Sequence, residues 1–190
     1  ATSITGTPKK LKSIGKKAFY NCSLLTSSNL FIPNTIEKIG ESAFEGCINL
    51  TKLSIDQDIN RTTKCEIDKR AFYGCNRLAG WLRIPTYVSK IGLQAFYGCT
   101  SFSKEAGTDF LYSTDGEQGY NHWLIGDVSG TSTQYQIIVH ASTYGIAGGA
   151  FLNSSNLTKP SLSTFKYVIS NPCLFNVAQV FIIAGCSTFE

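Results

Sequence analysis

The sequence AFYGC occurs at residues 71–75 and again at 95–99, with near copies AFYNC at 18–22 and AFEGC at 43–47. The Ala-Phe pair appears a fifth time at 150–151, so the intervals between pairs are 25, 28, 24 and 55 residues. Intervals of roughly 20–29 residues are typical of leucine-rich repeats. The last interval equals two such periods, or one period with an insertion.

A wider frame of apolar residues surrounds each Ala-Phe pair. In each of the five Ala-Phe pairs, isoleucine stands five residues before the Phe, and Leu or Phe stands six residues after it. Segments of alternating apolar and polar residues follow at 30–33, 53–55 and 82–85, and such alternation is typical of strands with one buried face. One unit cannot bury its own apolar edge, whereas stacked units share a continuous core.

The pattern therefore predicts a β-rich solenoid with short parallel strands and about six coils, forming a single domain over residues 1–190. We expect the Ala-Phe segments to form turns or single helical turns. The insertion at 103–136 interrupts the repeat, and Asp115-Gly116 indicates a hairpin within it. The coils are expected to be anchored at Phe19, Phe44, Phe72, Phe96, Phe151 and Phe175.

The repeated frame I-G-x-x-A-F-x-x-C-x-x-L-x-x-L-x-I-P resembles the BspA-type leucine-rich repeats of bacterial and protozoan surface proteins. The resemblance covers roughly residues 11–104 and 137–186, and the ending IIAGCSTFE is similar to the terminal element of such domains. It implies an extracellular or cell-surface protein that binds other molecules, often as an adhesin.

The recurring cysteines are expected to form a file along the solenoid, with coils about 4.8 Å apart. A Cys₄ zinc site needs four sulfurs about 2.3 Å from one ion, which a file cannot provide. A disulfide within the file stays possible but strained, so we interpret these thiols as core residues. Three cysteines lie outside this file: Cys65, Cys173 and Cys186. Either Cys173 and Cys186 form a disulfide, or these cysteines are buried as free thiols.

Composition and motifs limit the possible functions. The chain is 43% hydrophobic and 16% charged, as expected of an ordered protein, and its net charge of +4 is too small to imply a nucleic-acid partner. It contains two histidines and no G-x-S-x-G, H-E-x-x-H, P-loop or Rossmann glycine pattern. We therefore predict no enzymatic activity and no cofactor.

The outward face of the strands is the usual working surface of a solenoid, and we expect it to bind a protein partner on a host or neighbouring cell. Exposed aromatic residues on such a face are plausible contact points, although isolated surface aromatics are also common. Alternation assigns to this face Phe31, Lys52, Ser54, Arg83, Lys159, Ser161 and Phe181.

The insertion offers a second candidate surface, because insertions in solenoids emerge as loops on one face. Tyr112, Tyr120 and His122 are its candidate contact residues. The alternative is a hairpin packed along the edge of the solenoid, with Trp123 and the adjacent Leu-Ile pair buried.

Lysines crowd the beginning of the chain, where they either form a solvated end that discourages edge pairing or bind an acidic glycan or another polyanion. They are Lys9, Lys10, Lys12, Lys16 and Lys17. A structural spacer without a ligand is the third hypothesis. No apolar segment is long enough to span a bilayer, and from the lack of Met and of a leader we expect a mature or truncated piece of a longer protein.

Overall fold

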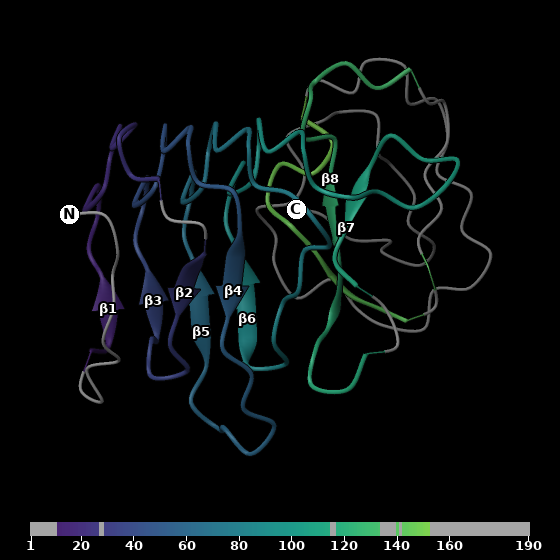
Figure 1. Ribbon diagram of the computed structural model, residues 1–190. Coiled ribbons are helices and arrows are strands. Elements are labelled where there is room, and N and C mark those ends of the chain that lie inside the picture. The colour runs from purple at the N-terminus through teal and green to yellow at the C-terminus, as the bar shows by residue number, and fades with distance from the viewer. Residues whose placement is uncertain (1–10, 27–28, 115–116, 134–139, 141, 153–190) are drawn as a thin grey trace, which may run out of the picture.

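The structure is a computed structural model, and it describes residues 11–26, 29–114, 117–133, 140 and 142–152. Successive coils stack side by side from the N-terminal end toward β6 (Val88–Ile91), followed by a differently organised region around β7 (Leu111–Tyr112) and β8 (His122–Gly126) (Figure 1). Several predicted features lie outside the described residues: the anchor Phe175, the Asp115-Gly116 turn, the Cys173–Cys186 pair, and the candidates Lys9, Lys10, Lys159, Ser161 and Phe181.

One parallel sheet is built from the residues that precede each Ala-Phe turn. It contains β1 (Ser13–Ile14), β3 (Lys38–Ile39), β5 (Cys65–Ile67) and β6 (Val88–Ile91), in that order within the described chain. The isoleucines that end these strands are in register from coil to coil and lie in the core. Sequence analysis identified these isoleucines but did not assign strands to them.

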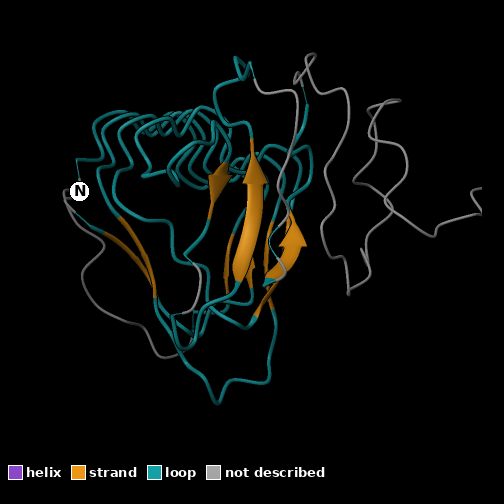
Figure 2. Ribbon diagram, turned by 90° about the vertical axis from the view of Figure 1, so that its right-hand side faces the viewer, coloured by secondary structure: helices purple, strands orange, loops and turns teal. Residues whose placement is uncertain are grey.

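A second parallel sheet contains the predicted alternating strands. Leu30 and Ile32 of β2 (Leu30–Ile32) pair with Leu53 and Ile55 of β4 (Leu53–Ile55). Residues 82–84 show the same alternation of buried and exposed side chains, although they form no named strand. Seen along the stack, the coils overlay as nested outlines, with turns at the top, the strands below them and further loops at the bottom (Figure 2).

The turns explain the glycine in AFYGC. Gly46 and Gly74 have φ values of 75° and 72°, and Asn21 holds the same place in the first coil with φ 54°. A left-handed backbone favours Gly, and Asn tolerates it better than most residues do. Main-chain bonds then join the coils; for example, Phe44 donates its N–H to the carbonyl of Ala71 at 2.8 Å. The predicted turn character of these segments is confirmed.

The anchor phenylalanines form one continuous file in the core. The rings of Phe19, Phe44, Phe72 and Phe96 stack with centroid separations of 5.0, 5.3 and 5.2 Å and interplanar angles of 5°, 3° and 8°. Offset stacking at this spacing is favourable, and full burial of such a ring contributes about 1.5–3 kcal/mol. These four anchors are therefore confirmed as layers of a solenoid core.

The cysteines that follow the anchor phenylalanines form a second file along the stack, and their thiols donate hydrogen bonds. The Sγ atoms of Cys47, Cys75 and Cys99 lie 3.0, 3.0 and 3.1 Å from a phenylalanine carbonyl oxygen of the preceding coil. All three are buried, which confirms their interpretation as core residues. Cys22 differs: it lies at the exposed end of the described stack.

The repeat changes character after the fourth anchor. β7 (Leu111–Tyr112) pairs antiparallel with β8 (His122–Gly126), which pairs parallel with β9 (Thr143–Ile146). The backbone after β9 still continues the coil ladder, because Gly148 donates to the carbonyl of Ile91 at 2.9 Å. However, the Phe151 ring packs edge-on against Phe110 at 5.8 Å instead of extending the ring file.

Candidate functional site

The candidate binding surface, which we call the strand face, comprises residues 29, 31, 52 and 54 in or beside β2 and β4, together with the exposed residues 81 and 83 of the next coil. In β2 and β4, Phe31 and Ser54 are direct neighbours, while the residues on either side of each point toward the core. Phe31, Lys52 and Arg83 are exposed, and Ser54 is half-buried. Of the predicted strand-face residues within the described chain, Phe31 and Ser54 are thus cross-strand neighbours, and the placement of Lys52 and Arg83 on the same surface stays a prediction.

Trp81 belongs to the same face, and sequence analysis missed it. Its side chain is 45% exposed, compared with 36% for Phe31. The signal was present in the alternation, because Trp81 stands two residues before Arg83 and therefore on the same side of the chain. Two large aromatic residues, Phe31 and Trp81, are thus exposed and available to a partner. Trp and Arg are enriched at the energetic centres of protein interfaces.

The insertion borders one end of the strand face. Arg83 Nε lies 2.9 Å from Oε2 of Glu117, and Gln57 Nε2 donates to the carbonyl of Gln118 at 2.8 Å. Main-chain bonds reinforce this contact, since Asn121 donates to the carbonyl of Ile84 at 2.8 Å. Residues 117–121 are therefore fixed against the solenoid as one wall of the strand face.

The expected protruding aromatic surface of the insertion needs correction. Tyr112 and His122 are buried, with 2% and 3% of their surfaces exposed, and Tyr120 is half-buried. Trp123 is buried as well, together with Leu124 and Ile125. The alternative of a hairpin packed along the edge is therefore confirmed, because β8 pairs on both sides and buries every residue from His122 to Gly126.

The lysines of the first described coil face acidic residues of the second. Lys12 Nζ lies 2.6 Å from Glu37 and Lys16 Nζ lies 2.8 Å from Glu41, while Lys17 lies 4.9 Å from the centre of the Tyr20 ring. Lys16 holds the pKa of the Glu41 carboxyl below its ordinary value, chiefly through their hydrogen bond. These pairings reduce the positive charge that a polyanion would meet at this end.

The buried thiols are poor nucleophiles. Burial raises the pKa of Cys47 to about 11 and that of Cys75 to about 12, and it raises the pKa of Cys99 as well. Because the thiolate is the reactive form, these side chains are chemically inert near neutral pH. Within the described part of the chain, all five cysteines are free, and no three His, Cys, Asp or Glu side chains are grouped so as to hold a metal ion.

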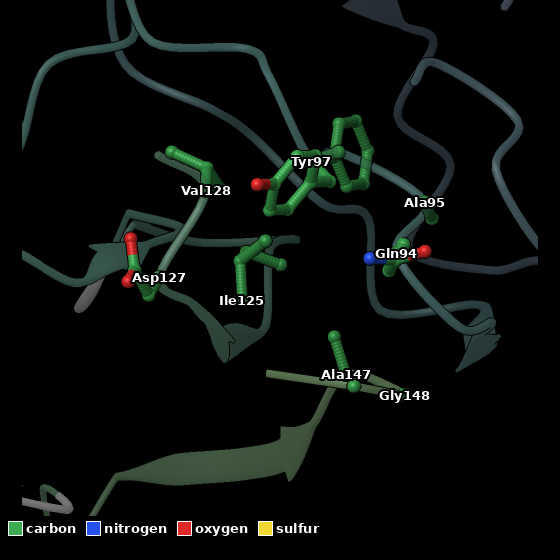
Figure 3. A pocket seen from close by; sticks show the side chains of 10 residues that line it. Gln94, Ala95, Tyr97, Ile125, Asp127, Val128, Ala147 and Gly148 are labelled. Atoms are coloured by element: carbon green, nitrogen blue, oxygen red, sulfur yellow. The ribbon is translucent and has the colours of Figure 1, made fainter. Parts of the chain in front are cut away.

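A small cavity lies where the ring file ends (Figure 3). Its lining includes Gln94 and Tyr97 of the fourth coil, Ile125 of β8, Val128 just after β8, and Ala147 after β9. Its volume of about 10 Å³ accommodates at most one water molecule. It is a packing gap between the regular coils and the insertion, far smaller than the sites that hold small-molecule ligands.

Stacked parallel coils with in-register isoleucine, phenylalanine and leucine positions define a leucine-rich repeat solenoid. The family profile described as "BspA type Leucine rich repeat region" matches residues 2–102 in 6 copies, which is just over half of the chain. The chain therefore belongs to the family of BspA-type leucine-rich repeat proteins. A comparison with curated proteins finds no match.

Solved structures with similarity to the chain include a leucine-rich cell surface protein from Faecalibacterium prausnitzii, with 20% identity and a TM-score of 0.46. A leucine-rich repeat protein of T. pallidum has 23% identity and a TM-score of 0.44, and the pneumococcal vaccine antigen PcpA has 23% and 0.47. The matches cover 84%, 84% and 80% of this chain but only 47%, 55% and 36% of those proteins. The described residues form no helix long and apolar enough to cross a membrane.

Proposed function

We propose that this chain is a non-catalytic repeat domain of a cell-surface or secreted protein, and that it binds a protein partner through the strand face. The observation that carries the proposal is the exposure of Phe31, on a strand that is paired with β4, and of Trp81 in the following coil. Because a rigid surface loses little conformational entropy on binding, less of the favourable contact energy is offset and the affinity is higher.

The chemistry of the face favours a protein ligand. Phe31 and Trp81 offer apolar area, whereas Lys52 and Arg83 supply charged hydrogen-bond donors beside them. Aromatic anchors with an adjacent Arg are the usual composition of energetic hot spots. Membership of the BspA-type family supports a role in recognition, and the resemblance to surface proteins supports an extracellular location.

The test is a matched pair of double variants. Phe31→Ser with Trp81→Ser removes the aromatic residues of the strand face, while Ile48→Ser with Leu93→Ser removes two side chains of similar exposure (44% and 38%) from the turns around the Ala-Phe segments. Binding is measured by surface plasmon resonance against a panel of purified extracellular-matrix proteins, and circular dichroism checks that both variants are folded.

We expect the strand-face variant to bind at least tenfold more weakly, because hot-spot aromatics each contribute on the order of 2 kcal/mol, and the turn variant to bind within about twofold of the parent. If the strand-face variant retains full affinity while folded, the site lies elsewhere. If no member of the panel binds the parent chain, the structural-spacer hypothesis gains support.

A further inference from the structure

Five Asn-x-Ser/Thr sequences occur in the chain, at Asn21, Asn49, Asn60, Asn153 and Asn156. Asparagine in this tripeptide, with any residue except Pro in the middle, is the acceptor of N-linked glycans. The last two sequences lie outside the described residues. A glycan is bulky and hydrated, so a folded protein accommodates it where the Asn side chain can extend into solvent. The three described acceptors differ in this respect.

The first two described acceptors take part in contacts between coils. Asn49 donates from Nδ2 to the carbonyl of Ser23 at 2.7 Å, and its Oδ1 accepts from Arg77 at 2.7 Å. Asn21 has φ 54°, and its Oδ1 occupies the space that a Cβ at Gly46 would need. A glycan on Nδ2 of Asn49 would compete for space with the neighbouring coil, and Asn21 is held in its turn by this packing.

Asn60 lies in a different setting, in the loop of residues 56–64 that joins β4 to β5. This loop extends beyond the neighbouring connections at the lower end of the stack (Figure 1). Asn60 and Thr62, the two residues that define the acceptor, are both exposed. The N–H of Asn60 donates to Oδ1 of Asp58 at 3.1 Å, while its side-chain amide is bonded to no other described residue. Nδ2 of Asn60 is therefore available for modification.

Arg61, the middle residue of this acceptor, holds the loop against the solenoid. Its guanidinium donates to the carbonyls of Asn34 and Ile36, the latter at 2.7 Å, and lies 4.1 Å from the centre of the Tyr87 ring. The two outer residues of the acceptor take no part in these contacts. A substituent on Asn60 would therefore leave the anchorage of the loop intact and extend from a defined position after β4.

We propose that Asn60 is an N-glycosylation site whose donor substrate is a lipid-linked oligosaccharide diphosphate. Nδ2 forms a bond to C1 of the first sugar, and the bond from C1 to the diphosphate oxygen breaks. The lipid diphosphate leaves with the electron pair of that bond, and the amide proton is released to water. Because this transfer takes place during export, the inference rests on the proposed surface or secreted location.

The test is peptide mapping of the full chain, expressed with a secretion leader in a eukaryotic cell line and purified from cells and medium together. An amidase that removes N-glycans converts a glycosylated Asn to Asp, and mass spectrometry locates each conversion. We expect conversion at Asn60 and none at Asn49. A chain whose leader has been cleaved but whose Asn60 is unconverted would overturn the proposal.

Substitutions at the third position of the acceptor give a matched control. Thr62→Ser keeps the hydroxyl and should retain the glycan, whereas Thr62→Ala and Asn60→Gln should lose it. Asn49→Gln should leave the glycan at Asn60 unchanged. Because both outer side chains of the acceptor are exposed, their variants should unfold at the same temperature as the enzymatically deglycosylated parent. A glycan that persists at Asn60 in Thr62→Ala would contradict this acceptor.

Failure of this inference is separable from failure of the proposed function. A chain without a glycan at Asn60 that still binds a protein through the strand face would reject the glycosylation site and leave the proposed function standing. A glycosylated chain whose strand-face double variant binds as tightly as the parent would confirm the modification and reject the strand face as the binding surface.

Discussion

The four regular coils and the interrupted region differ in how their core side chains pack. In the coils, equivalent side chains stack on one another, so each layer repeats the contacts of the last, as in the ring file from Phe19 to Phe96. In the interrupted region, the core is assembled from residues that are not repeat equivalents in register, such as Phe110 with Phe151. Repetition makes the first region predictable from spacing, whereas the second depends on individual contacts.

Removing one ring from the file gives the largest expected effect. Phe72 is fully buried between two stacked rings, so Phe72→Ala should lower the free energy of unfolding by about 3–5 kcal/mol. Phe151→Ala should cost less, because this ring packs edge-on outside the file. Urea unfolding followed by circular dichroism measures both, with labelling of the inert Cys75 thiol as a probe of coil opening. Equal decreases in the free energy of unfolding for the two variants would show that stacking in the ring file adds no extra stability.

Alanine at two glycines separates backbone strain from steric conflict. A Cβ at Gly126 would lie 1.9 Å from the carbonyl oxygen of Ala150, whereas a Cβ at Gly74 has no neighbour within 4 Å. Both residues have positive φ, so Gly74→Ala should cost about 1–2 kcal/mol from strain alone, and Gly126→Ala should cost more. Thermal unfolding measures both variants.

The control for this comparison is Gly74→Asn, which should be milder than Gly74→Ala because Asn21 already occupies the equivalent place in the first coil. If Asn and Ala were equally destabilising at position 74, the left-handed backbone would not explain the glycine of AFYGC.

The ion pair between Lys16 and Glu41 gives the smallest expected effect. The pKa of Glu41 is lowered in the folded protein, so its contribution to stability is present above the unfolded pKa and is lost as the pH falls through the lowered folded value. Glu41→Gln should therefore be slightly less stable than the parent at pH 7 and equal to it in acid. Salt should reduce the difference, since the pair is exposed. A difference that grows in acid would reverse the assigned sign.

The accuracy of the sequence-based predictions follows the same division. Spacing identified the ring file, the thiol file and the strands at 30–32 and 53–55, because one residue type recurs wherever one environment recurs. It missed the strands before the Ala-Phe turns, which are two to four residues long and have only their final isoleucine in common. Cys22 deviates because it lies at an end of the described stack, where the repeated environment is incomplete.

The interrupted region gave no such guidance. Tyr112 and His122 were expected to reach a partner, but the pairing of β8 on both sides turns them inward. The carboxylate of Glu105 lies 3.4 Å from Nε2 of His122 and 3.1 Å from Nε2 of His140, and no local sequence pattern predicts that these residues meet. Trp81 is an intermediate case, because the parity of its position relative to Arg83 was sufficient to place it on the strand face.

The direction of the bonds between coils has a consequence for synthesis on the ribosome. At the Ala-Phe turns, Phe19, Phe44 and Phe72 each donate an N–H to the coil that follows, while the thiols reach back to the coil before. A newly emerged coil therefore completes its predecessor and leaves its own amide waiting for the next. The nascent chain can therefore add coils in the order of synthesis, with the unpaired groups of only the most recent coil exposed at any time.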